Sequence, residues 1–187
     1  CLRSETTVKV FDQMRKLQSY TDEGSPGRDW NVATGMVIEG KAGFQIMGDW
    51  AKGEFTAAGK TPGVDYYCSP TPSNNGYLYN VDSFIFYKTS DPDKQEGQKL
   101  LAKLMMGKNF QKVFNLYKGS IPARLDVSMD EFDKCAKTSN ADIKTAGASG
   151  GLVPSFAHGM AQGNTMKAAL QDIITCLLYT SDAADEP

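Results

Sequence analysis

The sequence contains little of what catalysis or metal binding requires. Its 187 residues include one histidine, His158, and neither a phosphate-binding G-x-x-x-x-G-K-[ST] motif nor a dinucleotide-binding G-x-G-x-x-G motif. A metal site needs several His, Cys or carboxylate side chains together, and one histidine without local carboxylates is a poor ligand set. These absences argue against nucleotide-dependent enzymes and metalloproteins, and we expect no metal and no cofactor.

Long apolar runs and basic blocks are also absent. No apolar stretch approaches the roughly 20 residues that span a bilayer. The net charge of −2 comes without a Lys- or Arg-rich block that would suit nucleic acid. The composition, 41% hydrophobic and 22% charged, is that of an ordinary globular domain with its own core. The chain opens at Cys1, so the lack of a leader peptide indicates nothing about its compartment.

Cysteines are few, and two of the four lie near the chain ends. Cys176 begins CLLYTSDAADEP, which resembles the translation of an adapter used in DNA sequencing libraries. We therefore expect residues 176–187 to be a non-native tail and residues 1–175 to be part of a longer reading frame. The remaining pair, Cys68 and Cys135, has no C-x-x-C spacing. The sequence leaves open whether they are free thiols or, in an exported protein, a disulfide.

Hydrophobic periodicity predicts a mixed α/β chain in which helices dominate. Apolar residues three and four apart indicate helices, and short apolar runs bounded by glycine or proline indicate strands. The expected helices are 6–20 with Thr6 or Thr7 as cap, 30–39 ended by Gly40, 48–60, 91–105, 109–117, 129–139, 141–149 and 160–174. The expected strands are 41–48, 64–72 and 77–88, and 150–159 is expected to be a loop.

One stretch, GFQIMGDWAKGEF at 43–55, suggests a ligand site. Asp49 and Trp50 follow an apolar run at a predicted strand-to-helix switch, where α/β folds place ligands. An indole ring suits the flat C–H face of a sugar, and charged groups suit its hydroxyls. Packing of Trp50 into a gap between helix and sheet is an equally good interpretation of these residues alone.

Four further residues are candidates for the same site. Trp30 begins a helix and Asn80 lies within a predicted strand. Lys118 follows a helix, and His158 lies in a glycine-flanked loop. Each also has a structural explanation: local packing for Trp30 and His158, a backbone partner for Asn80, and the helix dipole for Lys118.

Two other functions stay open from the residues. Asp49 and Asp82 both lie at or near predicted strands, and paired carboxylates hydrolyse glycosidic bonds. The protein would then be a carbohydrate-active hydrolase. In the other alternative, the tryptophans and the histidine are structural residues of an interaction module.

Taken together, several segments resemble a known family. GRDWNVATGMVIEGKAGFQIMGDWAKGEFTAAGK at 27–60, YNVDSF, KGSIPARLD and LVPSFAHGMA follow one another as in the carboxyl-terminal half of the periplasmic sugar-binding proteins of ABC importers, nearest to glucose-binding proteins of proteobacteria. The resemblance runs from about the first helix to Ile174. It implies part of a two-lobed periplasmic-binding-protein (type II) fold, mostly the C-terminal lobe, helix-rich with a small sheet.

The resemblance also implies a function and a site. The protein would be a monomeric, non-enzymatic periplasmic receptor that delivers a monosaccharide, glucose in the first place, to an ABC permease, and it would have no nucleic-acid partner. Export would favour the Cys68–Cys135 disulfide. The site residues would be two aromatic walls, three hydrogen-bonding side chains and one neighbouring carboxylate: Trp30 and Trp50; Asn80, Lys118 and His158; and Asp49.

Overall fold

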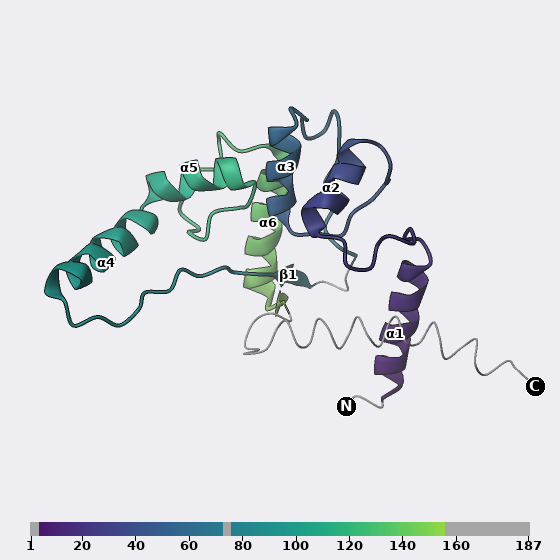
Figure 1. Ribbon diagram of the computed structural model, residues 1–187, viewed down its shortest axis with the longest axis horizontal. Coiled ribbons are helices and arrows are strands. Elements are labelled where there is room, and N and C mark those ends of the chain that lie inside the picture. Colours follow the sequence, from purple (N-terminus) through teal and green to yellow (C-terminus); the bar gives the residue numbers. More distant parts are fainter. Residues whose placement is uncertain (1–3, 73–75, 156–187) are drawn as a thin grey trace, which may run out of the picture. The chain divides into compact units, whose positions relative to one another are not determined.

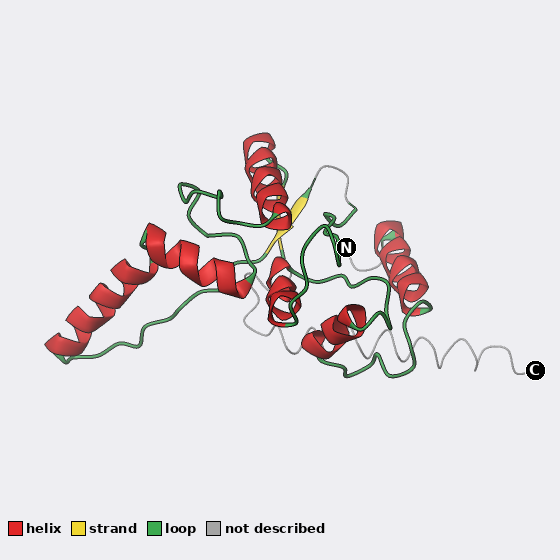
Figure 2. Ribbon diagram, turned by 90° about the horizontal axis from the view of Figure 1, so that it is seen from above, coloured by secondary structure: helices red, strands yellow, loops and turns green. Residues whose placement is uncertain are grey.

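The computed structural model describes residues 4–72 and 76–155 (Figure 1). These residues fall into two compact units, one containing residues 4–29 and the other residues 30–155, and each unit is described by itself. The expected α/β class, rich in helix with a small sheet, is confirmed (Figure 2). Within the described ranges, no helix is both long and apolar enough to cross a membrane.

The first unit consists of one helix and the loop that follows it. Helix α1 (Glu5–Gln18) begins after Ser4, whose hydroxyl accepts the Thr7 N–H at 3.3 Å. The predicted cap at Thr6 or Thr7 is therefore wrong, because Ser4 has the extended backbone of a cap residue and satisfies one of the free amides of the first turn.

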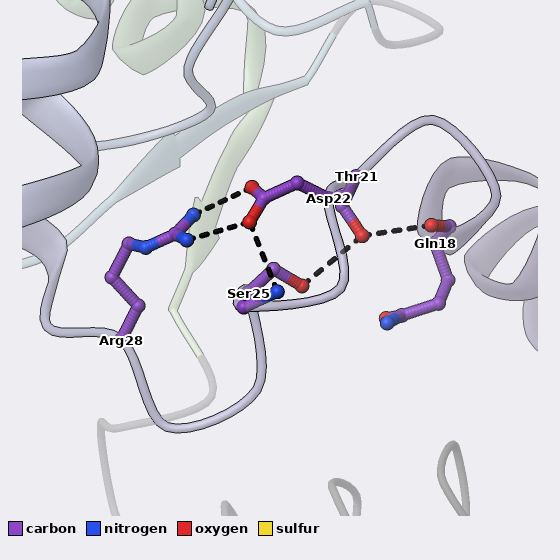
Figure 3. Close-up of polar contacts among 6 residues, drawn as sticks. Gln18, Thr21, Asp22, Ser25 and Arg28 are labelled. Carbon is purple, nitrogen blue, oxygen red and sulfur yellow. Dashed lines mark hydrogen bonds and ion pairs between the residues drawn. The ribbon is translucent and has the colours of Figure 1, made fainter.

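Hydrogen bonds organise the loop after α1, as Figure 3 shows. Both guanidinium NH2 groups of Arg28 donate to Asp22 at 2.6 Å, and the same carboxylate accepts the Gly24 N–H at 3.0 Å. The Thr21 hydroxyl donates to the Gln18 carbonyl, which joins the loop to the end of α1. Polar bonding of this kind allows the loop to keep one shape without a buried apolar side chain.

Helices are the main regular structure of the second unit, and local signals set several of their ends. Asp91 caps the first turn of its helix with its carboxylate, and the next helix ends at Gly119, which has a φ of 88°. The helices are α2 (Trp30–Ile38), the short 3-10 helix η1 (Asp49–Ala51), α3 (Lys52–Ala57), α4 (Pro92–Met105), α5 (Lys108–Lys118) and α6 (Lys134–Ser149).

Residues 134–149 form one helix, whereas the sequence predicts two short ones. The Asp133 carboxylate accepts the Ala136 N–H at the start, and Gly150 ends the helix in a left-handed conformation. Ser139 and Asn140 are weak helix formers. Here Asn140 is buried and Ser139 is hydrogen-bonded to the Tyr77 hydroxyl at 2.6 Å, so tertiary contacts carry the helix through the predicted break.

The sheet is smaller than the sequence predicts. Strand β1 (Tyr77–Tyr79) pairs in parallel with β2 (Leu152–Pro154), and α6 packs against both strands. The predicted loop at 150–159 therefore contains a strand, and the predicted strands 41–48 and 64–72 are not strands. Of the predicted strand 77–88, the first three residues form β1. An extended segment becomes a strand only beside a partner strand, and the described residues contain no further strand that pairs with 82–88.

A small core and a disulfide hold the second unit together. The buried cluster is Val127, Phe132 and Ala136, against which Ile121 packs. The Phe55 and Tyr66 rings stack with centroids 4.1 Å apart.

Two links connect the region around α3 to the start of α6. Cys68 and Cys135 form a disulfide with Cα atoms 5.7 Å apart, the pairing that the family resemblance favours. The Lys52 ammonium lies 2.8 Å from the Asp133 carboxylate, and only 7% of the lysine side chain is exposed. A buried ammonium is tolerated only with such a partner.

Candidate functional site

A hydrogen-bonded polar cluster joins two of the predicted site residues. The Lys118 ammonium and the Asn80 amide both donate to the Asp82 carboxylate, each at 3.1 Å. The Ser155 hydroxyl donates to the Asn80 amide oxygen at 3.0 Å. We call Asn80, Asp82, Lys118 and Ser155 the polar cluster.

The sheet explains why residues far apart in sequence meet here. Asn80 and Ser155 each directly follow a strand, and the strands are parallel with Tyr79 opposite Pro154. The Ser155 N–H donates to the Tyr79 carbonyl at 2.7 Å, which holds the carboxyl ends of β1 and β2 side by side. The polar cluster therefore lies at the carboxyl edge of the sheet, where open α/β folds bind their ligands.

Lys118 reaches the cluster from the last residue of α5. Its side chain is 34% exposed, and its ammonium lies 5.8 Å from the centre of the Phe114 ring. The negative end of the helix dipole and this ring both favour the cation. The Asp82 side chain is 68% exposed, so the carboxylate of the ion pair is accessible to a ligand from solvent.

Asp49 is turned toward the backbone that follows α5. Its Oδ2 accepts the Ile121 N–H at 2.8 Å. Burial raises the pKa of Asp49, while the Ile121 N–H and the positive charge of Lys52 act in the opposite direction, with smaller contributions from Ser120 and Lys118. The charge of Lys118 thus acts on Asp49, and the Oδ2 of Asp49 is used in a hydrogen bond within the chain.

The two tryptophans lie outside the hydrogen-bonded cluster. Trp50, the second residue of η1, is half-buried, and its ring packs so closely over Gly48 that a Cβ there would overlap it. Trp30, the first residue of α2, is 40% exposed, and its carbonyl accepts hydrogen bonds from Thr34 and Gln45. His158, the remaining predicted site residue, lies outside the described residues.

Two members of the polar cluster are not predicted as binding residues. The sequence points to Asp82 only for the hydrolase alternative, although Asn80 and Asp82 share one face of an alternating strand. Ser155 had no local signal, because it joins the cluster only through strand pairing.

The geometry gives little support to catalysis by these groups. A raised pKa, as Asp49 has, would suit a general acid. However, Asp49 holds a backbone N–H, and Asp82 is paired with Lys118. Residues 147–151 also match G-x-S-x-G, but Ser149 ends α6 and donates to the Ala146 carbonyl, whereas a nucleophile elbow lies between a strand and a helix. Within the described residues, no group of three or more His, Cys, Asp or Glu side chains suits a metal ion.

A polar cluster at the carboxyl edge of a parallel sheet, with no catalytic constellation in the part of the chain that the structure describes, is an arrangement suited to binding. The sequence agrees with this class: the chain belongs to the family of bacterial extracellular solute-binding proteins, whose model matches residues 3–169.

Among its relatives is a probable sugar-binding periplasmic protein of Brucella suis, 47% identical over 93% of this chain and 41% of that protein. A protein of the same description from Mesorhizobium japonicum is 44% identical over 98% of this chain and 45% of its own length. An uncharacterized ABC transporter extracellular-binding protein of Pyrococcus horikoshii is 33% identical over 95% of this chain and 39% of its own length. The chain thus spans less than half the length of these relatives.

Proposed function

We propose that this chain is part of an extracytoplasmic receptor that binds a monosaccharide, glucose in the first place, and delivers it to an ABC permease. The observation that carries the proposal is the polar cluster at the carboxyl edge of the sheet, in a chain of the solute-binding family. The names of the Brucella and Mesorhizobium relatives support a sugar as the ligand.

The chemistry of the polar cluster suits an uncharged polyhydroxylated ligand. Lys118 only donates and the Asp82 carboxylate only accepts, while Asn80 and Ser155 do both. Sugar hydroxyls also do both, so each can be satisfied here. The one positive and one negative charge are already paired, so the cluster does not require an ionic ligand.

The remaining predicted contacts complete the proposed site. Trp30 and Trp50 supply aromatic faces for the sugar ring, and His158 supplies a further hydrogen-bonding group. Asp82 joins this set because both Asn80 and Lys118 donate to it. Residues 1–175 form part of the C-terminal lobe of a monomeric periplasmic protein in this proposal, and residues 176–187 are a non-native tail.

The test is sugar binding by the full-length receptor that carries this chain, measured by isothermal titration calorimetry. Lys118→Met and Asp82→Asn should each weaken glucose binding about tenfold or more, because each removes a charge-assisted hydrogen bond. Lys112→Met is the matched control: Lys112 lies on the same helix and pairs with Glu131 at 2.7 Å, so its loss should change affinity less than about twofold.

Ligand analogues separate the coarser proposal from the finer one. A site built from polar groups rejects a sugar that lacks a hydroxyl, because its own groups are then left unpaired. Deoxyglucoses should therefore bind more weakly than glucose. Tighter binding of a pentose or a disaccharide would show that glucose is not the ligand, while the protein would still be a sugar receptor. No binding of any sugar, or release of reducing sugar from a glycoside, would reject the receptor itself.

A further inference from the structure

The turn that carries Lys118 is in backbone contact with the start of α3. A Cβ added at Gly53 would lie 2.9 Å from the Lys118 carbonyl oxygen, and one added at Gly119 would lie 2.7 Å from the Gly53 nitrogen. Real Cβ atoms do not approach so closely, so the two glycines permit this contact. The position of the Lys118 backbone is therefore set by the residues that begin α3.

Asp49 makes a second contact with the same turn, through a hydrogen bond. It opens η1, which runs directly into α3. Its Oδ2 accepts the N–H of Ile121, two residues beyond Gly119, at 2.8 Å. Ile121 in turn packs against the core cluster that contains Phe132. The chain on the carboxyl side of Lys118 is thus held by one backbone contact and one charge-assisted hydrogen bond.

We propose that Asp49 is a positioning residue for sugar binding: it touches the backbone after α5 rather than the ligand, and it acts by holding Lys118 where its ammonium meets Asp82. This inference rests on the proposed function, since it assigns a role within that site. It differs from the sequence-based expectation, in which Asp49 is a neighbour of the bound sugar.

The charged groups around Asp49 fit this role. Lys52 on α3 and Lys118 on α5 both favour its charged form, and its negative charge raises the pKa of Tyr77 on β1, an effect smaller than that of burial. Lys52 is already paired with Asp133. Asp49 is therefore within electrostatic range of groups on α3, α5 and β1, and its carboxylate accepts the N–H that follows α5.

Calorimetry on variants of the full-length receptor tests the role. Asp49→Ala should weaken glucose binding about tenfold. Asp49→Asn keeps an oxygen that accepts the Ile121 N–H and should return affinity to within about threefold of the wild type. In a Lys118→Met background, Asp49→Ala should cost less than about twofold further, because residues that act through one another are not additive. Equal losses in the Asn and Ala variants, additive with Lys118→Met, would mean that Asp49 contacts the sugar and would overturn the proposal.

A second measurement needs no sugar. In protein labelled with 13C at lysine Cε, the Lys118 resonance should shift in Asp49→Ala and stay near its wild-type position in Asp49→Asn. Gly53→Ala, which presses on the Lys118 carbonyl, should shift it too, while Gly97→Ala, in open space on α4, should not. An unmoved Lys118 resonance in Asp49→Ala overturns the positioning role. If the receptor binds no sugar but this resonance moves, the proposed function fails and the positioning of Lys118 stands.

Discussion

Two glycines with left-handed backbones show how much surroundings matter at the scale of a residue. Gly119 and Gly150 end α5 and α6 with φ of 88° and 73°. A Cβ at Gly150 would meet open space, whereas one at Gly119 would press on the backbone of Gly53. Gly150→Ala should therefore lower the free energy of unfolding by about 1 kcal/mol, because only the strain of a left-handed backbone is added.

Gly119→Ala should lower the free energy of unfolding by more, about 2 kcal/mol or above, because its Cβ adds displacement of α3 to the backbone strain. Urea denaturation of the two variants measures both free energies of unfolding. Equal costs would show that α3 and the α5 turn are not in firm contact.

The buried Lys52 provides a second prediction at this scale. Asp133→Ala leaves its ammonium without a partner and also removes the cap of α6, so unfolding free energy should fall by about 3 kcal/mol or more. Glu131→Gln, which breaks the more exposed pair with Lys112, should cost under about 1 kcal/mol. Thermal and urea denaturation of the two variants compare them. Similar losses would mean that burial of Lys52 carries no penalty.

Single residues were predictable where the signal was local. Gly40 follows the end of its helix as the sequence predicts, and the helix predicted from residue 91 starts there, with Asp91 as its cap. Asn80 and Asp82 could be placed on one strand face by alternation. Their meeting with Lys118, 36 residues after Asp82, could not, because no local rule relates a strand end to the end of a later helix.

At the scale of elements, the loop after α1 depends on a pair that titrates. The Arg28 hydrogen bonds lower the pKa of Asp22 to about 2. A carboxylate with a lowered pKa stabilises the folded state above its unfolded pKa of about 4, and the contribution is lost as pH falls through about 2. Protection of the Gly24 amide, which donates to Asp22, measured against its intrinsic exchange rate, should therefore persist at neutral pH and fall between about pH 4 and 2.

Asp22→Asn provides the comparison for this loop. In this variant the Gly24 amide should exchange faster than in the wild type at pH 7. Its protection relative to the intrinsic rate should then not change between about pH 4 and 2. An unchanged Gly24 rate in this variant would show that the pair with Arg28 does not order the loop.

Helices were predicted better than strands for a physical reason. A helix satisfies its backbone within its own segment, so periodicity and caps located α2, α4 and α5. A strand needs a neighbour, and the aromatic, β-branched sequence of 77–88 carries no information about where that neighbour lies. The extended residues Phe84, Ile85 and Tyr87 consequently remain 65%, 72% and 79% exposed.

At the scale of the molecule, the disulfide is the longest covalent constraint among the described residues. It joins residues 67 positions apart, and closing a loop of that length in the unfolded chain stabilises the folded state by roughly 4 kcal/mol in the chain-entropy model. Cys68→Ser combined with Cys135→Ser should therefore lower the guanidinium midpoint markedly. Reductant should lower the wild-type midpoint to that of the double variant and leave the double variant unchanged. A wild type insensitive to reductant, with two free thiols by titration, would contradict the bridge.

A further prediction concerns how much of the receptor a sugar needs. The chain spans 41% of its Brucella relative, and in the proposed two-lobed receptor the other lobe supplies further contacts. The 187-residue chain alone should therefore bind glucose weakly or not at all, while the longer receptor binds it. Calorimetry of both proteins measures the difference. Micromolar or tighter binding by the isolated chain would show that one lobe suffices.

The parallel pairing of β1 with β2 has a consequence for the order of assembly. Asn80 and Ser155, which this pairing brings together, are 75 positions apart in sequence, and α4, α5 and α6 lie between them. Closing so long a loop costs entropy before any contact rewards it, and contacts distant in sequence form late. During synthesis, the polar cluster cannot be complete until Ser155 has left the ribosome, although Asn80, Asp82 and Lys118 emerge well before it.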